Sequence, residues 1–180
     1  MLIDRYDSVL FIVDIQARLA PAVHGADTII ARTRLLMEAA SRLEVPITVS
    51  EQYPQGLGPT DERLQPLPNT AHVFPKIAFS VAKDPAVAEH LRGLGRRQVL
   101  LAGMETHICV LQTALGLKEQ GYEVAVIADA VGSRLPERKA LGLERMRAHE
   151  IDVADSEMVL FEWLGEAGTP VFRELSRLIR

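Results

Sequence analysis

The clearest structural signal in this chain is Gln98-Val99-Leu100-Leu101-Ala102-Gly103-Met104-Glu105-Thr106-His107-Ile108-Cys109. Its first five residues, 98–102, have the character of a strand that is buried on both faces. The residues after it, Val110-Leu111-Gln112-Thr113-Ala114-Leu115, are typical of the start of a helix, which we expect to run to about Gln120 and to stop at Gly121. A strand that leads into a helix in this way is typical of an α/β fold.

Cys109 is the only cysteine of the chain, and it stands where the expected strand gives way to the helix. The positive end of a helix dipole favours the thiolate, which is the reactive form of cysteine. Taken alone, a single cysteine is more often a small buried apolar residue than a nucleophile. Its position therefore suggests catalysis, and the groups around it decide between the two.

Composition limits the class of protein. The chain has 180 residues, of which 48% are hydrophobic and 24% are charged, with a formal net charge of -4. This is the size of one domain, so we expect residues 1–180 to form a single domain. The mild negative charge and scattered basic residues give no footprint for nucleic acid and do not suggest a membrane surface, so a small molecule is the expected partner.

The sequence also predicts a compartment. One cysteine cannot form an intramolecular disulfide, and residues 1–7 lack the basic and then apolar pattern of a signal peptide. Charged residues interrupt every apolar run well before the roughly 20 positions that a bilayer requires. We therefore expect a cytoplasmic protein.

Strands and helices are expected to alternate along the chain. The expected strands are residues 8–13, 47–50, 71–74, 98–102, 123–128 and 151–153. The expected helices are residues 27–43 with Asp27 as the N-cap, 84–92 opened by Asp84-Pro85, 110–120, 136–148, 157–164, and 170–178 capped by Thr169. The alternation implies right-handed crossovers and a three-layer, Rossmann-like α/β fold, in which a mainly parallel six-stranded sheet has helices on both faces.

One edge of the expected sheet collects the reactive side chains. Asp14, Lys76, Cys109 and Asp129 all stand at or just past the carboxyl ends of expected strands. Open α/β sheets bind their ligands beyond this edge. The long irregular connection over residues 51–70, which is rich in proline and glycine, is expected to form a wall of the pocket.

An acid, a lysine and a thiol at one edge are chemically complementary. Considered singly, Asp14 is as well explained by turn capping, and Lys76 by a surface side chain with an apolar stem. Together, Asp14 can accept the thiol proton while Lys76 stabilises the thiolate of Cys109. We therefore expect iodoacetamide to modify Cys109 faster than it modifies a free thiol.

Three short motifs resemble those of the isochorismatase-like hydrolases, the cysteine hydrolase superfamily that includes nicotinamidases and carbamoylsarcosine amidases. The motifs are Val13-Asp14-Ile15-Gln16, Lys76 with Phe79-Ser80, and the run from Gly103 to Cys109. They occur in the family's order and at its spacing, and the resemblance spans nearly the whole chain. Residues 50–58 look most like the isochorismatase-domain-containing hydrolases and differ from the Asp-x-His metal motif of nicotinamidases.

The resemblance implies a role for each group. Asp14 would be the general base, Lys76 the cation that supports the thiolate, and Cys109 the nucleophile. A cis peptide bond is implied between Met104 and Glu105, and the backbone N–H groups of Glu105 and Cys109 would form an oxyanion hole. Residues expected to line the substrate pocket are Gln16, Glu51, Tyr53, Phe79, Thr106 and His107, with Gln52 beside them, whereas Asp129 and Ser133 are expected to be structural.

The implied reaction is hydrolysis of the C–N bond of a small amide-like molecule through a thioester, with water as second substrate and with no metal and no organic cofactor. Two other functions compete with it. A non-catalytic protein would use the same scaffold to bind a metabolite or a partner, although it has no need of a buried acid and lysine. An isochorismate-type vinyl ether hydrolase would use acid chemistry from Asp14 alone, which leaves Cys109 without a role. The resemblance also implies a homo-oligomer.

Overall fold

The computed structural model describes residues 1–179 and contains one six-stranded sheet. Its strands are β1 (Ser8–Val13), β2 (Ile47–Gln52), β3 (His72–Lys76), β4 (Gln98–Met104), β5 (Glu123–Gly132) and β6 (Asp152–Ala154). Every neighbouring pair is parallel, and the strand order is β3-β2-β1-β4-β5-β6. The six-stranded α/β fold predicted from the sequence is therefore confirmed, and the sheet is parallel throughout.

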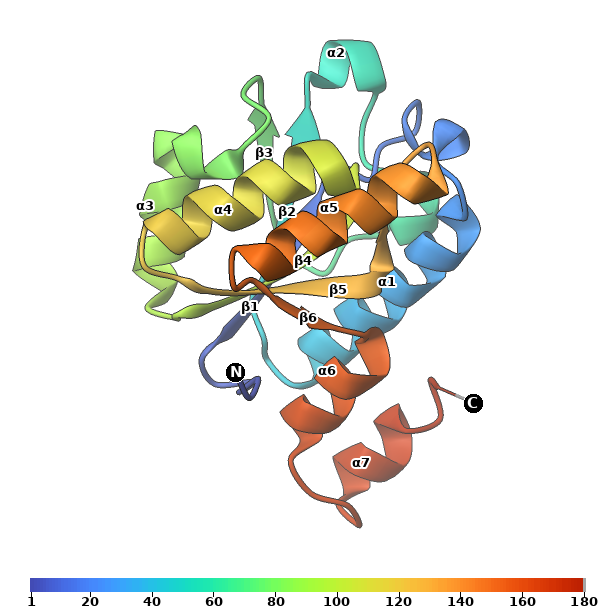
Figure 1. Cartoon of the computed structure of the whole chain (residues 1–180). Coiled ribbons are helices and arrows are strands. Elements are labelled where there is room, and N and C mark those ends of the chain that lie inside the picture. Colours follow the sequence, from blue (N-terminus) through green and yellow to red (C-terminus); the bar gives the residue numbers. More distant parts are fainter. Residues whose placement is uncertain (180) are drawn as a thin grey trace.

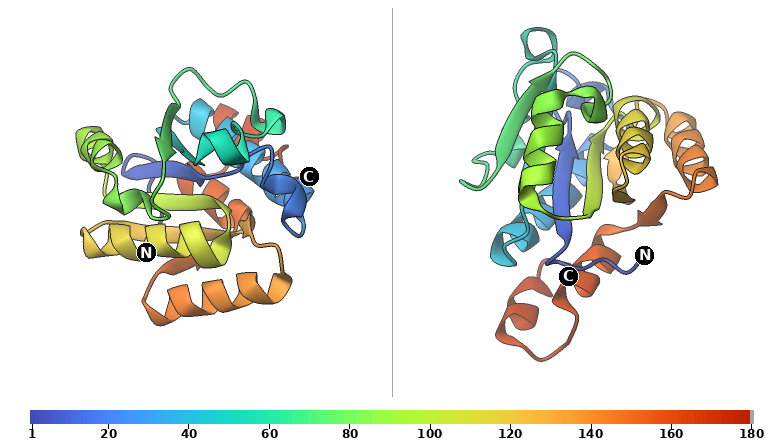
Figure 2. Two further views of the ribbon diagram at one scale, coloured as in Figure 1. Left: turned by 90° about the horizontal axis from the view of Figure 1, so that it is seen from above. Right: turned by 90° about the vertical axis from the view of Figure 1, so that its left-hand side faces the viewer.

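Helices cover both faces of the sheet (Figures 1 and 2). The α-helices are α1 (Ala26–Arg42), α2 (Pro54–Leu57), α3 (Pro85–Leu94), α4 (Leu111–Glu119), α5 (Pro136–Ala148), α6 (Ser156–Leu164) and α7 (Pro170–Leu175). Shorter helical turns are η1 (Ala20–Ala22), η2 (Glu62–Leu64), η3 (Val81–Lys83) and the π-helical η4 (Thr106–Val110). Helices α3, α4 and α5 lie on one face, and α1, α6 and α7 lie on the other, which gives three layers.

The central strand β1 shows why both faces need helices. All six of its residues are buried. Leu10 and Ile12 belong to the apolar cluster that α1 and α6 cover, whereas Val9, Phe11 and Val13 belong to the cluster that α3 and α4 cover. Because successive side chains of a strand point to opposite faces, a continuous apolar run is the pattern that a doubly covered strand requires.

Several predicted elements agree closely with the structure. Strand β1 and helix α5 have the predicted bounds. The carboxylate of Asp84 accepts hydrogen bonds from the backbone N–H groups of Ala86 and Val87 at the start of α3, and Thr169 caps α7 through the N–H of Phe172. These starts were predictable because an N-cap acts through local contacts.

Other predicted bounds were wrong. Strands β2 and β4 each run two residues further than predicted, and β3 and β6 each start and end later than predicted. Helix α1 has Gly25 at its N-cap instead of Asp27, α7 ends at Leu175, and the nominally irregular residues 51–70 contain α2 and η2. The strand extensions depend on pairing with distant strands, which local sequence does not encode.

Strand β5 departs most from its predicted end. It continues to Gly132, so Asp129 lies within the strand and not just past it. The register shifts between Leu101 and Gly103 of β4, after which Gly103 pairs with Val131. An extra stretch of β5 is accommodated there, which brings residues 131–132 back into the sheet.

The strand order places a switch point between β1 and β4. From β1 the chain moves outward through β2 and β3, and it then returns to lay β4 on the other side of β1. Ligands of open α/β sheets bind in the crevice beyond such a point. Asp14 directly follows β1, and Cys109 lies in the turn after β4, so two of the three predicted catalytic residues stand at the switch point.

Gly103 of β4 allows the backbones of β1 and β4 to approach closely at this edge of the sheet. Its φ is +128°, and a Cβ on it would lie 1.9 Å from the carbonyl oxygen of Val13. Both the backbone conformation and the contact distance therefore require glycine at this position.

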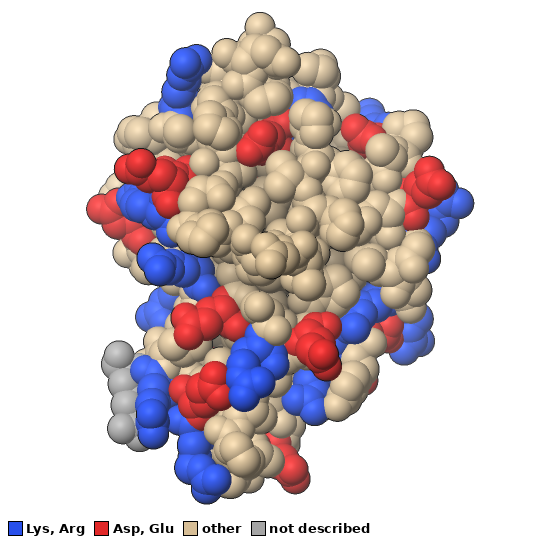
Figure 3. Space-filling view, turned by 180° about the vertical axis from the view of Figure 1, so that it is seen from behind, with Lys and Arg blue, Asp and Glu red and all other residues tan. Residues whose placement is uncertain are grey.

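On the face of the molecule shown in Figure 3, neither acidic nor basic side chains gather into a large patch. Acidic and basic side chains are interspersed there around a largely uncharged centre. Among the helices formed by residues 1–179, none combines the length and the apolar character that crossing a membrane would need.

Candidate active site

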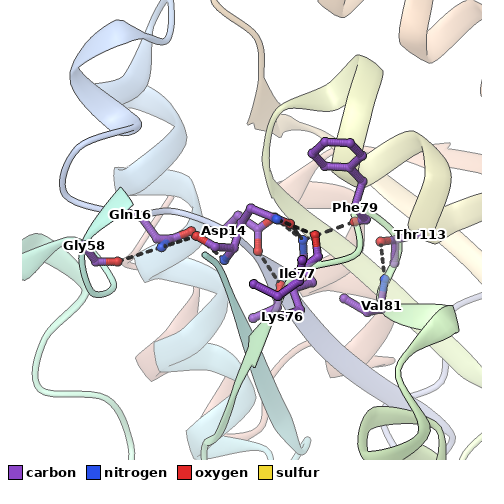
Figure 4. Close-up of polar contacts among 10 residues, drawn as sticks. Asp14, Gln16, Gly58, Lys76, Ile77, Phe79, Val81 and Thr113 are labelled. Atoms are coloured by element: carbon purple, nitrogen blue, oxygen red, sulfur yellow. Dashed lines mark hydrogen bonds and ion pairs between the residues drawn. The ribbon is translucent and has the colours of Figure 1, made fainter. Parts of the chain in front are cut away.

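Asp14 directly follows β1 and is held by side chains from β2 and β3. It is fully buried, its Oδ1 accepts a hydrogen bond from Ser50 Oγ at 2.7 Å, and its Oδ2 lies 2.6 Å from Lys76 Nζ. Its φ of 52° is in the left-handed region, which aspartate tolerates better than most residues. Figure 4 shows the carboxylate facing Lys76.

Lys76 is the last residue of β3, and its side chain is 1% exposed. Its ammonium group donates to Asp14 Oδ2 at 2.6 Å, to Gln52 Oε1 at 2.6 Å and to the carbonyl oxygen of Phe79 at 3.1 Å. These bonds occupy all three donors of the ammonium group. A buried charge is tolerated when it is both paired and hydrogen-bonded, and Lys76 meets both conditions.

Strand β2 supplies the residues that hold this pair. Ser50 binds Asp14 and Gln52 binds Lys76, and residues two apart on a strand project to the same face. Ser50 was not predicted as a site residue, and Gln52 was expected only to line the pocket. Three consecutive polar residues, Ser50-Glu51-Gln52, at the end of the strand were the signal that could have identified both.

Cys109 lies in η4 and is 7% exposed. Burial raises the pKa of its thiol to about 12; the charge of Asp14 raises the pKa further, whereas the charge of Lys76 lowers it. The thiol therefore lies within the influence of both charges. In the resting protein, burial and the charge of Asp14 outweigh the charge of Lys76, so the direction of the pKa shift is opposite to the expectation of a ready thiolate.

The raised pKa concerns loss of the thiol proton to solvent. Transfer of that proton from Cys109 to Asp14 leaves the net charge of the three groups unchanged, because the thiolate replaces the carboxylate as the partner of Lys76. Such an internal transfer avoids adding a second buried anion. The arrangement can therefore keep the thiol protonated at rest and still provide a thiolate during a reaction.

Glu105 anchors the turn that carries Cys109. The peptide bond between Met104 and Glu105 is cis, as the resemblance implied. The Glu105 carbonyl accepts hydrogen bonds from the N–H groups of Ile108 and Val110 at 3.0 and 3.2 Å. Its carboxylate, which is 6% exposed, accepts from the backbone N–H and the Nε of Arg134 at 2.9 and 3.1 Å. The oxyanion hole itself stays a prediction.

Two of the predicted pocket residues hold the loop that follows β2. Gln16 Nε2 donates to the carbonyl oxygens of Gln52 and Gly58, and its Oε1 accepts from the N–H of Gln52 at 2.8 Å (Figure 4). Glu51 Oε1 accepts from both the backbone N–H and the Oγ1 of Thr60 at 2.7 Å. Both side chains thus have structural partners, and their contact with substrate stays a prediction.

The other predicted pocket residues differ in exposure. Tyr53 and Phe79 are each 53% exposed. Thr106 is fully buried, and its Oγ1 has no hydrogen-bond partner within residues 1–179. His107 Nδ1 lies 2.9 Å from Ser133 Oγ. None of these observations tests a role in substrate binding, which remains a prediction for all of them.

Asp129 has a structural role, as expected. Its carboxylate accepts hydrogen bonds from both the backbone N–H and the Oγ of Ser156, which fixes the start of α6. Across the part of the chain that the structure describes, no three His, Cys, Asp or Glu side chains are grouped so that they could hold a metal ion.

Two cavities of the described residues can be compared with the position of the thiol, and neither has Cys109 in its lining. A cavity of ≈ 740 Å³ lies between α1, residues 64–68 and Glu174 of α7, away from the buried pair. A smaller cavity of ≈ 410 Å³ has Lys76 in its wall, together with Ile77 and residues of α2. The buried charges, and not the size of a cavity, indicate where the site lies, because perturbed ionisable groups carry the chemistry.

Known proteins are similar to this chain over nearly its whole length. The family model described as the isochorismatase domain matches residues 8–158. "Isochorismatase domain-containing protein 1" of Salmo salar is 38% identical over 173 residues, which cover 96% of this chain and 61% of the relative. The chain therefore spans about three fifths of that relative's length. "Secreted isochorismatase effector Isc1" of Phytophthora sojae is 37% identical over 181 residues, covering 97% of this chain and 85% of the relative.

Solved structures show the same fold. A structure described as MAR1 ribonuclease from Caenorhabditis elegans has a TM-score of 0.94 and 34% identity, and the match covers 99% of this chain and 92% of that one. The YcaC gene product of Escherichia coli, described as an octameric hydrolase of unknown specificity, has a TM-score of 0.92 over 99% of this chain and 90% of that one. Its identity is 21%, so it shares the fold alone.

Proposed function

The chain belongs to the isochorismatase family, and from that premise we propose that it is a cysteine hydrolase that cleaves the C–N bond of a small amide-like molecule. Membership of the family supports a hydrolase. The observation that carries the finer proposal is the buried pair of Asp14 and Lys76, whose two charges both act on the thiol of Cys109. A buried acid and cation beside a nucleophile are the parts that covalent catalysis needs.

In the first half of the proposed reaction, Asp14 takes the thiol proton and Cys109 Sγ attacks the carbonyl carbon. The carbonyl oxygen becomes an oxyanion, which the N–H groups of Glu105 and Cys109 would stabilise. When the tetrahedral intermediate collapses, the C–N bond breaks and Asp14 gives its proton to the leaving nitrogen. Ammonia or an amine departs, and a thioester remains on Cys109.

In the second half, water attacks the thioester and Asp14 takes a proton from it. The second tetrahedral intermediate collapses with cleavage of the C–S bond, and the proton returns from Asp14 to Sγ. The products are a carboxylic acid and the free thiol. Asp14 thus acts as base and acid in turn, and no metal or organic cofactor is required.

The proposed role of Lys76 follows from its hydrogen bonds. All three of its donors are occupied by Asp14, Gln52 and Phe79. On the thiol, the charge of Lys76 is its larger effect, and a hydrogen bond from Lys76 adds a smaller one in the same direction. By balancing whichever partner is ionised, it allows the proton to move between Cys109 and Asp14 without leaving an unpaired charge.

The proposed substrate is a small molecule. The net charge of -4 provides no electrostatic attraction for a polyanion, so RNA is not proposed as the substrate despite the name of the Caenorhabditis elegans structure. A homo-oligomer is also proposed, because Tyr53, Ile77 and Phe79 near the site are 53%, 72% and 53% exposed. The cytoplasmic location stays a prediction, since the Phytophthora sojae relative is named as secreted.

The decisive experiment is a panel of amides and ureides with detection of released ammonia, run on the unaltered protein and on Cys109→Ala. We expect release by the unaltered protein and none by the variant. Trapping the acyl group on Cys109 with a slow substrate, followed by measurement of intact mass, would show the thioester. Matched thermal unfolding of the two proteins is the control for the fold.

With isochorismate added to the panel, the competing functions give different results. A vinyl ether hydrolase would release pyruvate from isochorismate at the same rate with and without the thiol. A binding protein would show saturable binding of a panel member without turnover by either protein. Either result would overturn the proposal.

A further inference from the structure

A cavity of ≈ 460 Å³ lies where β5 passes into α5, the orange helix of Figure 1. Its lining consists of His107, Arg134, Leu135 and Arg138, which we call the α5 cavity. This volume falls within the range of sites for small ligands. The proposed hydrolase mechanism uses none of these four side chains, although His107 was expected from the sequence to line the substrate pocket.

The α5 cavity has an excess of positive groups. Two of its four lining residues are arginines and a third is histidine. Within residues 1–179, the one carboxylate that pairs with them is that of Glu105, which binds Arg134. Arg138 forms no ion pair or side-chain hydrogen bond with any other described residue. Its planar group, with five donors, is thus available for an anion.

His107 adds a further potential donor. Its Nδ1 is engaged by Ser133 Oγ at 2.9 Å, and its Nε2 has no hydrogen-bond partner in the described part of the chain. Residues two apart on a helical turn project to nearly opposite sides. His107 and Cys109 are related in this way within η4, so the α5 cavity lies behind the turn that carries the thiol and is distinct from the thiol's own surroundings.

The cavity is mechanically connected to that turn. Helix α5 packs against η4 so closely that a Cβ on Gly142 would lie 3.1 Å from the Cα of His107. Arg134, another lining residue, holds the carboxylate of Glu105, and the Glu105 carbonyl in turn accepts the N–H groups of Ile108 and Val110. A ligand that engages Arg134 would therefore act on the position of η4.

We propose that the α5 cavity is a second site, which binds a small molecule carrying a carboxylate or a phosphate on an apolar body. Arg138 and Arg134 bind the anionic group through charge-assisted hydrogen bonds, and Leu135 contacts the apolar body. The ligand is bound and released without chemical change. Binding does not depend on the proposed reaction, so it can be tested without any turnover.

The test uses calorimetry with three probes of similar shape: benzoate, phenyl phosphate and uncharged benzyl alcohol. We expect the two anions to bind and benzyl alcohol not to bind; comparison of benzoate with phenyl phosphate distinguishes a carboxylate from a phosphate site. Arg138→Gln should weaken anion binding by about tenfold or more, because a hydrogen bond to a charged group is lost. Arg138→Lys should restore part of the affinity, since lysine keeps the positive charge but lacks the planar guanidinium group that donates two parallel hydrogen bonds.

Arg145→Gln, which removes an exposed arginine from the same helix outside the cavity, is the matched control and should bind as the unaltered protein does. Cys109→Ala should also bind both anions unchanged, because the site lies on the other side of η4. Thermal unfolding without ligand should be the same for Arg138→Gln and the unaltered protein.

Three results would overturn the proposal. The first is equal anion binding by Arg138→Gln and the unaltered protein, or no binding by either. The second is loss of anion binding in Cys109→Ala, which would assign the anion to the thiol's pocket. The third is a change of oligomeric mass in Arg138→Gln by light scattering, which would assign these arginines to an interface between copies of the chain.

Discussion

Lys76 Nζ lies 2.6 Å from Asp14 Oδ2, and neither side chain is more than 1% exposed. Both charged groups are buried away from water, so each depends on the other and on the polar groups of β2 for its stability. A pair of this kind contributes little to stability as a whole but is costly to break. The pair therefore links the fold of the protein to its proposed chemistry.

Replacing one member of the pair should destabilise the fold. For Lys76→Met we expect a loss of about 3–5 kcal/mol in the free energy of unfolding, because the carboxylate of Asp14 is left buried and unpaired. Urea denaturation measures the change. The double variant Lys76→Met with Asp14→Asn should recover most of it, because asparagine carries no charge and suits the left-handed backbone of position 14. Arg42→Met, which breaks the exposed pair with Glu174, is the control and should change stability far less. Equal effects at the two sites would show that the buried pair is not as isolated from water as the structure indicates.

Replacing the acid alone should separate thiol reactivity from turnover. In the unaltered protein, a thiol pKa of about 12 keeps Cys109 protonated at neutral pH, so alkylation by iodoacetamide should be slow and should accelerate as the pH rises. Asp14→Asn removes the neighbouring anion and leaves Lys76 to favour the thiolate, which lowers the thiol pKa. Asparagine also suits the left-handed backbone of this position.

We therefore expect Asp14→Asn to be alkylated faster than the unaltered protein at neutral pH and to have lost its turnover. Mass spectrometry of the modified protein measures the rate. Asp14→Asn combined with Lys76→Met is the control, since the cation is then also removed and the gain in rate should vanish. Slower alkylation in Asp14→Asn would contradict the effect assigned to Asp14, whose charge raises the pKa of the Cys109 thiol.

The contact between β1 and β4 should tolerate no side chain at position 103. We expect Gly103→Ala to lose more than about 4 kcal/mol of stability or to fail to fold, because its Cβ would overlap the Val13 carbonyl. Gly93→Ala, in the last turn of α3 with nothing within 4 Å of the added Cβ, should instead be tolerated or gain up to about 0.5 kcal/mol. Thermal and urea unfolding of the two variants give the comparison. A well-tolerated Gly103→Ala would show that β4 can move away from β1.

Stability should also fall as the pH falls through the range of histidine titration. Burial, and secondarily the charge of His72, lower the pKa of His90, which contacts Thr48 Oγ1 through Nε2 at 3.0 Å. Because the folded state binds this proton less readily than the unfolded state, the stabilisation is complete above the ordinary pKa of about 6.5 and is lost below it. His90→Gln should reduce the pH dependence of urea unfolding in this window, whereas His149→Gln, at an exposed position, is the control. An unchanged pH dependence in His90→Gln would contradict the linkage.

The sequence predicted those parts of the fold that depend on local patterns. Strand β1 could be recognised because five consecutive apolar residues, Val9 to Val13, are buried on both faces, and α3 because Asp84-Pro85 is a complete start signal by itself. The end of β5 could not be recognised, because residues 131–132 join the sheet only through the register shift opposite Gly103. Local sequence has no means of encoding that pairing.

The candidate site likewise has features that the sequence could predict and features that it could not. Asp14, Lys76 and Cys109 were predicted from their places at strand ends and from the family's motifs; the structure brings Asp14 and Lys76 into contact, and the catalytic roles of all three stay predictions. The resting state of the thiol was not predictable, because burial and the neighbouring charge set its pKa. Both depend on the packed tertiary structure.

The order of the strands also has a consequence for how this protein comes into being during synthesis. Lys76 follows Asp14 by 62 positions, and Cys109 is made later still, yet the three chain segments become neighbours only when β1 has been flanked on both sides. A nascent or truncated chain that ends before β4 would hold the acid and the amine but no nucleophile. Reactivity would then arise late and all at once, so regain of turnover after dilution from urea would report completion of long-range assembly and not early helix formation.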